Sequence, residues 1–192
     1  MRCEWPSVGP SENEKIAMQR RNEQHTTWLR RWTGTHDAAV LFDSDRDEFT
    51  GRGFFAAVVA RPNVAVVAFT TDGDVFGGFY SVPVMEENTA FPDASICAFS
   101  FESHGRCVTP KRFVVKKAKK NKARVVVSTT YPEGFVSFHV GMSSFSIGNE
   151  RSGSFCWSLS KAFETMQDTT LTGKRGVHAW HRCVRVIAVQ LH

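Results

Sequence analysis

Short hydrophobic runs alternate with short polar runs along most of this chain. This pattern predicts many strands and few helices. The segment 64–69 is almost continuously apolar and β-branched, which is typical of a buried strand. Asp72-Gly73 follows it, and this dipeptide between two apolar runs is a strong hairpin signal. The second strand of the hairpin is expected over 75–82, and Pro83 ends it.

Further strands are expected wherever a short apolar run lies between glycine, proline or asparagine residues. These runs lie at 94–101, 112–115, 124–128, 136–140, 144–147, 154–159 and 182–191. No repeat of fixed period relates them. The chain is therefore expected to be an α+β protein, mainly β, with an antiparallel two-sheet β-sandwich and a few short helices.

A helix is expected over 11–32, a stretch without proline or glycine. Ser11 and Glu14 fit a capping box, in which each side chain satisfies a backbone N–H at the helix start. Gly34 follows as a stop signal. The face expected to pack on the domain lies in the last turns and consists of Trp28, Leu29 and Trp32. The earlier turns are polar on most faces and are expected to lie exposed or to pair with a partner helix.

Residues 1–10 contain two prolines and a glycine and are expected to form a disordered leader. A short helix is expected over 49–59, with Phe54, Phe55 and Val58 facing inward. The stretch 28–192 is expected to form one domain. Because no run of about 18 apolar residues and no signal-peptide pattern is present, we expect no transmembrane segment and a cytoplasmic location.

The five cysteines are scattered along the chain, at Cys3, Cys97, Cys107, Cys156 and Cys183. None of them forms the C-x2-C or C-x4-C pair that usually supplies metal ligands from one loop. In a reducing compartment they are expected to be free thiols, several of them buried. We expect neither a metal nor a cofactor, and a redox role would require an exposed thiol of low pKa.

The positive charge is concentrated in one segment. Residues 111–124 contain 8 of the 24 basic residues and no acidic one, so the rest of the chain carries 16 basic and 19 acidic residues. Clustered cations attract phosphate by releasing counterions, on nucleic acid or on an anionic surface. The candidate binding residues are Lys111, Arg112, Lys116, Lys117, Lys119, Lys120, Lys122 and Arg124. A nuclear-import signal has the same composition, so the segment could serve in nuclear import. A third interpretation is a solvated loop that binds no ligand.

Five motifs occur in order along the chain. They are LFDSDRDEF at 41–49, DGDVFGGFYSVP at 72–83, PDASICAFS at 92–100, FSIGN at 145–149 and RVIAVQL at 185–191. This series resembles a TLDc domain, a eukaryotic module linked to oxidative-stress protection and proton-pump regulation. The resemblance implies two packed antiparallel sheets with short helices around them. The basic segment is not one of the family's motifs, so we interpret 111–124 as an insert.

The resemblance assigns a structural role to Asp72, Gly73, Phe76, Gly77, Gly78, Phe79 and Gly148. Glycine inside a strand marks a bulge or a close approach of another group, so Gly77-Gly78 needs no ligand, although a binding role stays open. The last strand departs from the family, because Ala188 and Gln190 stand where the family usually has Glu and Trp.

Three patterns with chemical meaning are rejected. The acidic run at 43–47 begins like a calcium loop, but Glu48 and Phe54 occupy the positions that need Gly and a bidentate Glu. Ser158 and Lys161 match S-x-x-K without the companion motifs of the serine acyl enzymes. His178 and His181 have no third ligand nearby, and we expect them to be surface or capping residues.

The sequence thus favours a non-enzymatic TLDc-like protein-interaction module with no catalytic residues. By resemblance, its partner would be the cytosolic sector of the vacuolar proton pump (V-ATPase), and its role would lie in the oxidative-stress response. The alternative is a nucleic-acid-associated regulatory protein that binds through 111–124, with a nuclear location. A redox-active or hydrolytic enzyme with a site hidden from sequence spacing is a third hypothesis.

Overall fold

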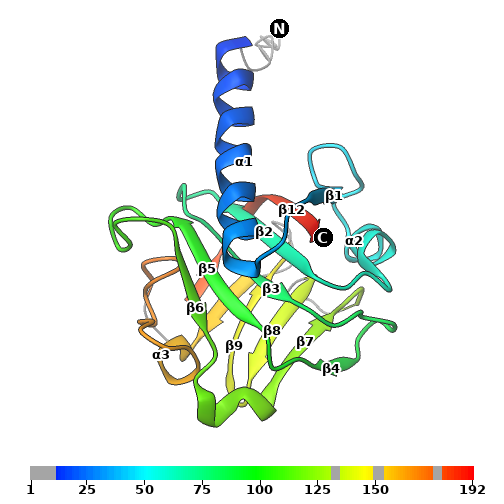
Figure 1. Ribbon diagram of the computed structural model, residues 1–192, viewed down its shortest axis with the longest axis vertical. Coiled ribbons are helices and arrows are strands. Elements are labelled where there is room, and N and C mark those ends of the chain that lie inside the picture. The colour runs from blue at the N-terminus through cyan, green and yellow to red at the C-terminus, as the bar shows by residue number, and fades with distance from the viewer. Residues whose placement is uncertain (1–11, 131–134, 149–153, 175–178) are drawn as a thin grey trace, which may run out of the picture.

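Two six-stranded antiparallel sheets are packed face to face in the computed structural model, which describes residues 12–130, 135–148, 154–174 and 179–192 (Figure 1). The first sheet has the order β1 (Ala38–Asp43), β12 (Cys183–Leu191), β2 (Val64–Thr70), β3 (Val75–Tyr80), β5 (Cys97–Glu102) and β6 (Lys111–Val114). The second has the order β11 (Ala179–His181), β10 (Ser154–Trp157), β9 (Ser143–Ile147), β8 (Val136–Val140), β7 (Ala123–Val127) and β4 (Ala90–Pro92). The predicted mainly β sandwich is confirmed.

The helices lie around the sandwich, and the longest of them extends beyond it (Figure 1). They are α1 (Glu12–Thr33), α2 (Gly51–Val58), the 3-10 helix η1 (Lys117–Lys122) and α3 (Leu159–Ala162). Gly34 ends α1 at φ 74°, a left-handed conformation in which its N–H bonds the Arg30 carbonyl oxygen at 2.8 Å. Thr50 begins α2, because its hydroxyl accepts a hydrogen bond from Gly53 N at 3.1 Å.

The main core lies between the sheets and is rich in aromatic rings. Phe76 and Tyr80 of β3 contribute to it from the first sheet, and Phe138 and Phe145 from the second. The Phe138 and Phe145 rings stack with centroids 4.7 Å apart. All four side chains are fully buried, which explains why a chain with 16 Phe has so few exposed rings in the part described.

Most predicted elements are present, and their ends show which local interactions outweigh the apolar pattern. The strand expected over 94–101 starts only at Cys97, because the Asp93 carboxylate accepts a hydrogen bond from Ser95 N at 2.8 Å and holds a turn. The strand expected over 154–159 stops at Trp157, since Ser158 adopts φ 50° and α3 follows. The capping box at residue 11 lies outside the described residues.

Three strands were not expected from the sequence, and each lies at the edge of a sheet. Two of them, β4 and β11, have only three residues. The third, β1, pairs with β12 along the opposite edge of the first sheet from β6. Edge strands receive much of their order from the neighbouring strand, so their own residue pattern carries a weak signal.

Candidate functional site

The C-terminal half of α1 packs on the outer face of the first sheet. Leu29 is 2% exposed, and the Trp32 ring stacks on Phe101 with centroids 5.7 Å apart. The Arg112 side chain donates a hydrogen bond to the Trp32 carbonyl oxygen, one of the groups that a helix end leaves unpaired. The predicted packing of Trp28, Leu29 and Trp32 is confirmed. These contacts fix the direction in which the rest of α1 points.

A groove of about 680 Å³ lies between α1 and the first sheet. Its apolar lining is formed by Leu29, Val40, Val67, Phe69, Ile187 and Val189. Its polar lining is formed by Gln19, Asn22, His25 and Thr26 of α1, with Asp43, Arg46 and Arg185 from the sheet side. An apolar floor with a polar rim suits a segment of a protein partner.

His25 and Asp43 are buried polar residues in the lining of this groove. The His25 ring stacks on Phe101 at a centroid distance of 4.2 Å, and its Nε2 lies 3.6 Å from the Glu102 carboxylate. Burial, and after it the positive charge of Arg21, lowers the pKa of His25 from 6.5 to about 4. The imidazole is therefore neutral at pH 7. It precedes Trp28 and Leu29 by three and four residues, so the helical spacing that predicted their packing also placed His25 on that face.

A bidentate ion pair between Asp43, at the end of β1, and Arg185 of β12 contributes to the lining of the groove. Arg185 donates to both oxygens of Asp43, from Nε at 2.9 Å and Nη2 at 2.7 Å, and its Nε also lies 2.9 Å from Asp45. Asp47 accepts a hydrogen bond from Asp43 N at 2.7 Å. Burial raises the pKa of Asp43, but the hydrogen bonds and charge of Arg185 outweigh it, so the pKa is lowered. The carboxylates of the run that resembles a calcium loop are thus paired with groups of the protein itself.

The β2–β3 hairpin forms a junction with two other loops. Gly73 adopts φ 81° at its turn, and Asp72 pairs with Lys174 at 2.9 Å, which lowers the pKa of Asp72. The next residue, Asp74, is 2% exposed and accepts a hydrogen bond from Arg106, while His104 Nδ1 lies 2.9 Å from the same oxygen. The hydrogen bonds of Arg106 to the carbonyl oxygens of Thr170 and Leu171 complete the junction.

The glycine pair of β3 is explained by packing. A Cβ on Gly78 would lie 2.6 Å from the Phe138 ring of the opposite sheet, and one on Gly77 would lie 1.9 Å from the Val66 carbonyl oxygen. The neighbours on either side alternate, with Phe76 in the core between the sheets and Phe79 in the layer under α1. Gly148, after β9, donates its N–H to Ser154 Oγ at 2.8 Å.

The basic segment is an ordered connection from the first sheet to the second. Arg112 in β6 bonds the end of α1, Lys116 donates to the Ser160 carbonyl oxygen at 2.7 Å, and Arg124 donates to the carbonyl oxygens of Asn121 and Ala123. Lys111 Nζ lies 5.3 Å from the centroid of the Phe113 ring. The segment places its other four cations on η1; these are Lys117, Lys119, Lys120 and Lys122. Nucleic-acid binding through the segment stays a prediction.

A family model described as the TLDc domain matches residues 11–179. The chain belongs to the TLDc family. None of the curated proteins compared with the chain matches it.

The TLDc sandwich of this chain continues past the matched residues. Strand β12 pairs with β1 on one side and with β2 on the other, so the first sheet is incomplete without it. Its two departures from the family pattern fit the structure. Ala188 is fully buried in the core, and the buried Gln190 donates a hydrogen bond to the Pro62 carbonyl oxygen at 3.2 Å.

The described cysteines of this TLDc domain are free, and three of them are buried, as predicted. Burial raises the pKa of Cys97 to about 12 and that of Cys183 to about 11, and it also raises the pKa of Cys156. Such thiols are protonated at neutral pH and are poor nucleophiles. Cys107 is half-buried, and Cys3 lies outside the described residues.

The other patterns considered in the sequence can now be located in the TLDc fold. Ser158 precedes the four-residue helix α3, and Lys161 lies exposed on it. The prediction of a surface or capping role for His181 is wrong, because it is 3% exposed in strand β11 and burial lowers its pKa to about 4. His178 lies outside the described residues. Among the described ranges, no three His, Cys, Asp or Glu residues gather as metal ligands, and no helix is long and apolar enough to span a membrane.

Proposed function

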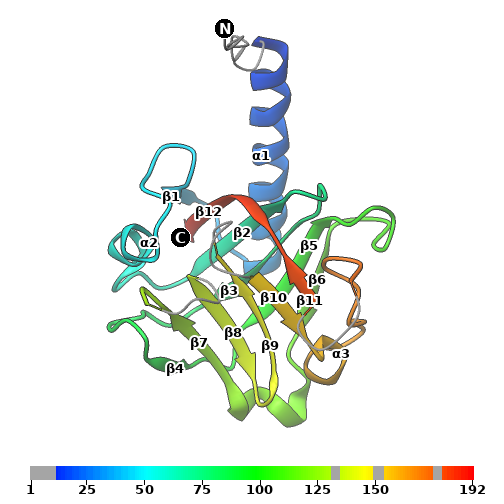
Figure 2. The same cartoon turned by 180° about the vertical axis from the view of Figure 1, so that it is seen from behind.

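We propose that this TLDc domain is a non-enzymatic docking module that binds a protein partner through α1 and the groove beside it. The observation that carries the proposal is the division of α1 into two halves. Its C-terminal half is anchored on the first sheet, whereas its N-terminal half projects away from the sandwich (Figures 1 and 2). A rigidly held helix presents a binding face at little cost in conformational entropy.

Exposed apolar side chains on α1 and β1 support this site. Ile16 is 43% exposed on the projecting half of α1, and Val40 is 54% exposed in the edge strand β1. Single exposed apolar residues are common, but Val40 also lines the groove. Together the helix face, the groove and the free edge of β1 offer both a helical and an extended partner segment a place to bind.

By family resemblance, we propose the cytosolic sector of the vacuolar proton pump as the partner, within the oxidative-stress response. Binding would change the assembly of that sector if the docked segment differs between its assembled and dissociated states. A catalytic role is the less favoured alternative, since the buried thiols are protonated at neutral pH and the acidic turn is held by Arg185.

The test is capture of the purified cytosolic sector of the pump by immobilised protein. The variant Ile16→Glu with Val40→Asp is expected to lower the affinity about a hundredfold, because it places two charges in an apolar contact. Val108→Glu is the matched control, since Val108 is 97% exposed in the loop between β5 and β6 and should tolerate the charge. Equal capture by wild type and the double variant would reject docking at α1.

A further inference from the structure

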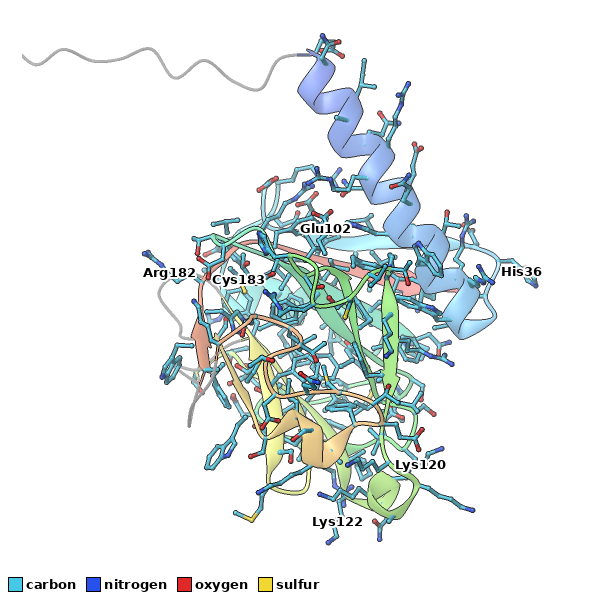
Figure 3. The ribbon with its side chains drawn as sticks, turned by 90° about the vertical axis from the view of Figure 1, so that its left-hand side faces the viewer. His36, Glu102, Lys120, Lys122, Arg182 and Cys183 are labelled. Atoms are coloured by element: carbon cyan, nitrogen blue, oxygen red, sulfur yellow. The ribbon has the colours of Figure 1, made fainter. Side chains whose placement is uncertain are left out.

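The end of the sandwich remote from α1 carries a cluster of lysines beside an exposed methionine. The lysines are Lys117, Lys119, Lys120 and Lys122 of η1. Met142 is 89% exposed at the tip of the β8–β9 hairpin. Figure 3 shows Lys120 and Lys122 at the end opposite to α1, and Figure 2 shows the turn between β8 and β9 at that end. We call these five residues the lysine–methionine end.

The four lysines form two short rows. In a 3-10 helix, residues three apart lie above one another, so Lys117 aligns with Lys120 and Lys119 with Lys122. In the part of the chain that the structure describes, none of these four ammonium groups has an ion pair or a hydrogen bond. Like charges held this close repel one another, and an anionic ligand would relieve the repulsion.

A backbone hydrogen bond connects the hairpin that carries Met142 to η1. Gly141 N donates a hydrogen bond to the Lys122 carbonyl oxygen at 3.1 Å, and a Cβ placed on Gly141 would lie 3.7 Å from Lys122 Cδ. The hairpin tip and η1 therefore present one surface. An exposed methionine alone is unremarkable. An apolar tip next to a helix with four unpaired lysines, however, suits a membrane surface, where charged headgroups lie outside the hydrocarbon.

We propose that the lysine–methionine end binds the surface of an anionic phospholipid bilayer. The lysines contact the headgroups, and Met142 inserts at the boundary between headgroups and acyl chains. Each lysine near an anionic leaflet strengthens binding by about fivefold. Bilayer binding also leaves α1 pointing away from the membrane, so the groove stays open to a protein partner (Figure 3).

The observations favour a bilayer over a nucleic acid. Arginine is the side chain best suited to reading bases, but the guanidinium groups of Arg112 and Arg124 are bonded to backbone carbonyl oxygens. Among the described residues, the exposed apolar side chain beside η1 is a flexible thioether and not an aromatic ring on which bases could stack. Burial of Met142 would contribute to membrane binding and not to phosphate binding.

The experiment is flotation of the full chain with phosphatidylcholine vesicles that contain or lack phosphatidylserine. Wild type is expected to float with the anionic vesicles and to be released as the salt concentration rises. Changing all four lysines to Gln should weaken binding roughly several hundredfold. Met142→Gln should weaken it about tenfold, because the apolar tip is lost while every charge stays.

A matched control removes the same charge elsewhere. Arg20, Arg31, Arg52 and Arg61 are exposed and lie outside this surface, and changing them to Gln alters the net charge equally. This variant should bind within about twofold of wild type, and circular dichroism should show all variants folded. Equal weakening by the two fourfold variants would reject the proposal, as would the absence of flotation. So would oligonucleotide binding that is tighter than vesicle binding and insensitive to Met142→Gln.

Discussion

The two sheets of the sandwich differ in what covers their outer faces. In the first sheet, β3 is buried at every position and β2 at all but one, so both faces of these two strands are packed. In the second sheet, β7 and β8 alternate between buried and half-buried positions, as expected when one face is partly exposed, although β9 is buried at every position. The cover on the first sheet is the C-terminal half of α1, together with the aromatic layer beneath it.

This difference explains the two patterns in the sequence. The β2 run of valines and alanines is continuous because both of its faces pack, whereas β8 carries the polar residues Ser137 and His139 at alternate positions and β7 carries Arg124. It also separates two kinds of stability. Contacts between the sheets hold the whole domain, and contacts on the outer face hold α1.

Gly78→Val is expected to cause the largest loss, because its side chain would overlap the Phe138 ring between the sheets. We expect the free energy of unfolding to fall by about 3 kcal/mol or more, measured by urea denaturation. Gly105→Ala is the control, since no atom lies within 4 Å of its Cβ position and its cost is the strain of φ 80° alone. Equal losses in the two variants would mean that the sheets do not approach closely at Gly78.

Leu29→Ala removes a buried anchor of α1 on the first sheet. A loss of about 3 kcal/mol is expected, concentrated in the helix and not spread over the sandwich. Hydrogen exchange should therefore accelerate at the amides of α1 much more than at those of β8. Uniform acceleration in both elements would show that α1 is part of the same cooperative unit as the second sheet.

The substitution His25→Phe tests, through the pH dependence of stability, whether α1 buries His25 on the outer face of the first sheet. The pKa of His25 is about 4 in the folded protein because of burial, so the imidazole is neutral there, while the unfolded chain takes up a proton below pH 6.5. Stability is therefore fully present above pH 6.5 and is lost as the pH falls towards 4. The substitution should flatten the loss measured by urea denaturation over this range.

Some pH dependence should remain in His25→Phe, because burial also lowers the pKa of His181 in the second sheet to about 4. His36→Phe is the control, since the His36 side chain is exposed (Figure 3). A profile for His25→Phe that coincides with wild type would show that α1 does not bury His25 in solution.

The smallest effect is expected for the variant with Gln at Lys117, Lys119, Lys120 and Lys122. Because these side chains have no partner among the described residues, the free energy of unfolding should change by less than about 0.5 kcal/mol in urea denaturation. Removal of like charges would raise it slightly, and added salt should then have less effect on stability than in wild type. A large loss would mean that η1 supports the fold.

The sequence predicted the elements whose signals are local. Asp72-Gly73 marked the hairpin, and Gly34 marked the end of α1. The spacing of Trp28, Leu29 and Trp32 identified the packed face of the helix. Each of these signals acts within a few residues, where backbone conformation and side-chain direction decide the outcome.

The parts that could not be predicted depend on residues far apart in the chain. Arg112 was grouped with the anion-binding cations, yet its guanidinium bonds α1 across 80 positions of sequence. The acidic turn finds its partner Arg185 across 142 positions. Residue composition shows that such side chains are charged, but only the tertiary fold selects the group that each of them meets.

Strand β12 has a consequence for how the domain is made. The ribosome produces this strand after every other element of the sandwich, yet it lies between β1 and β2 and pairs with both. Until it leaves the exit tunnel, β1 has no neighbour and β2 has an unpaired edge. The domain must therefore complete its folding after residue 191 has been released, and during synthesis the edge of β2 is a target for chaperones.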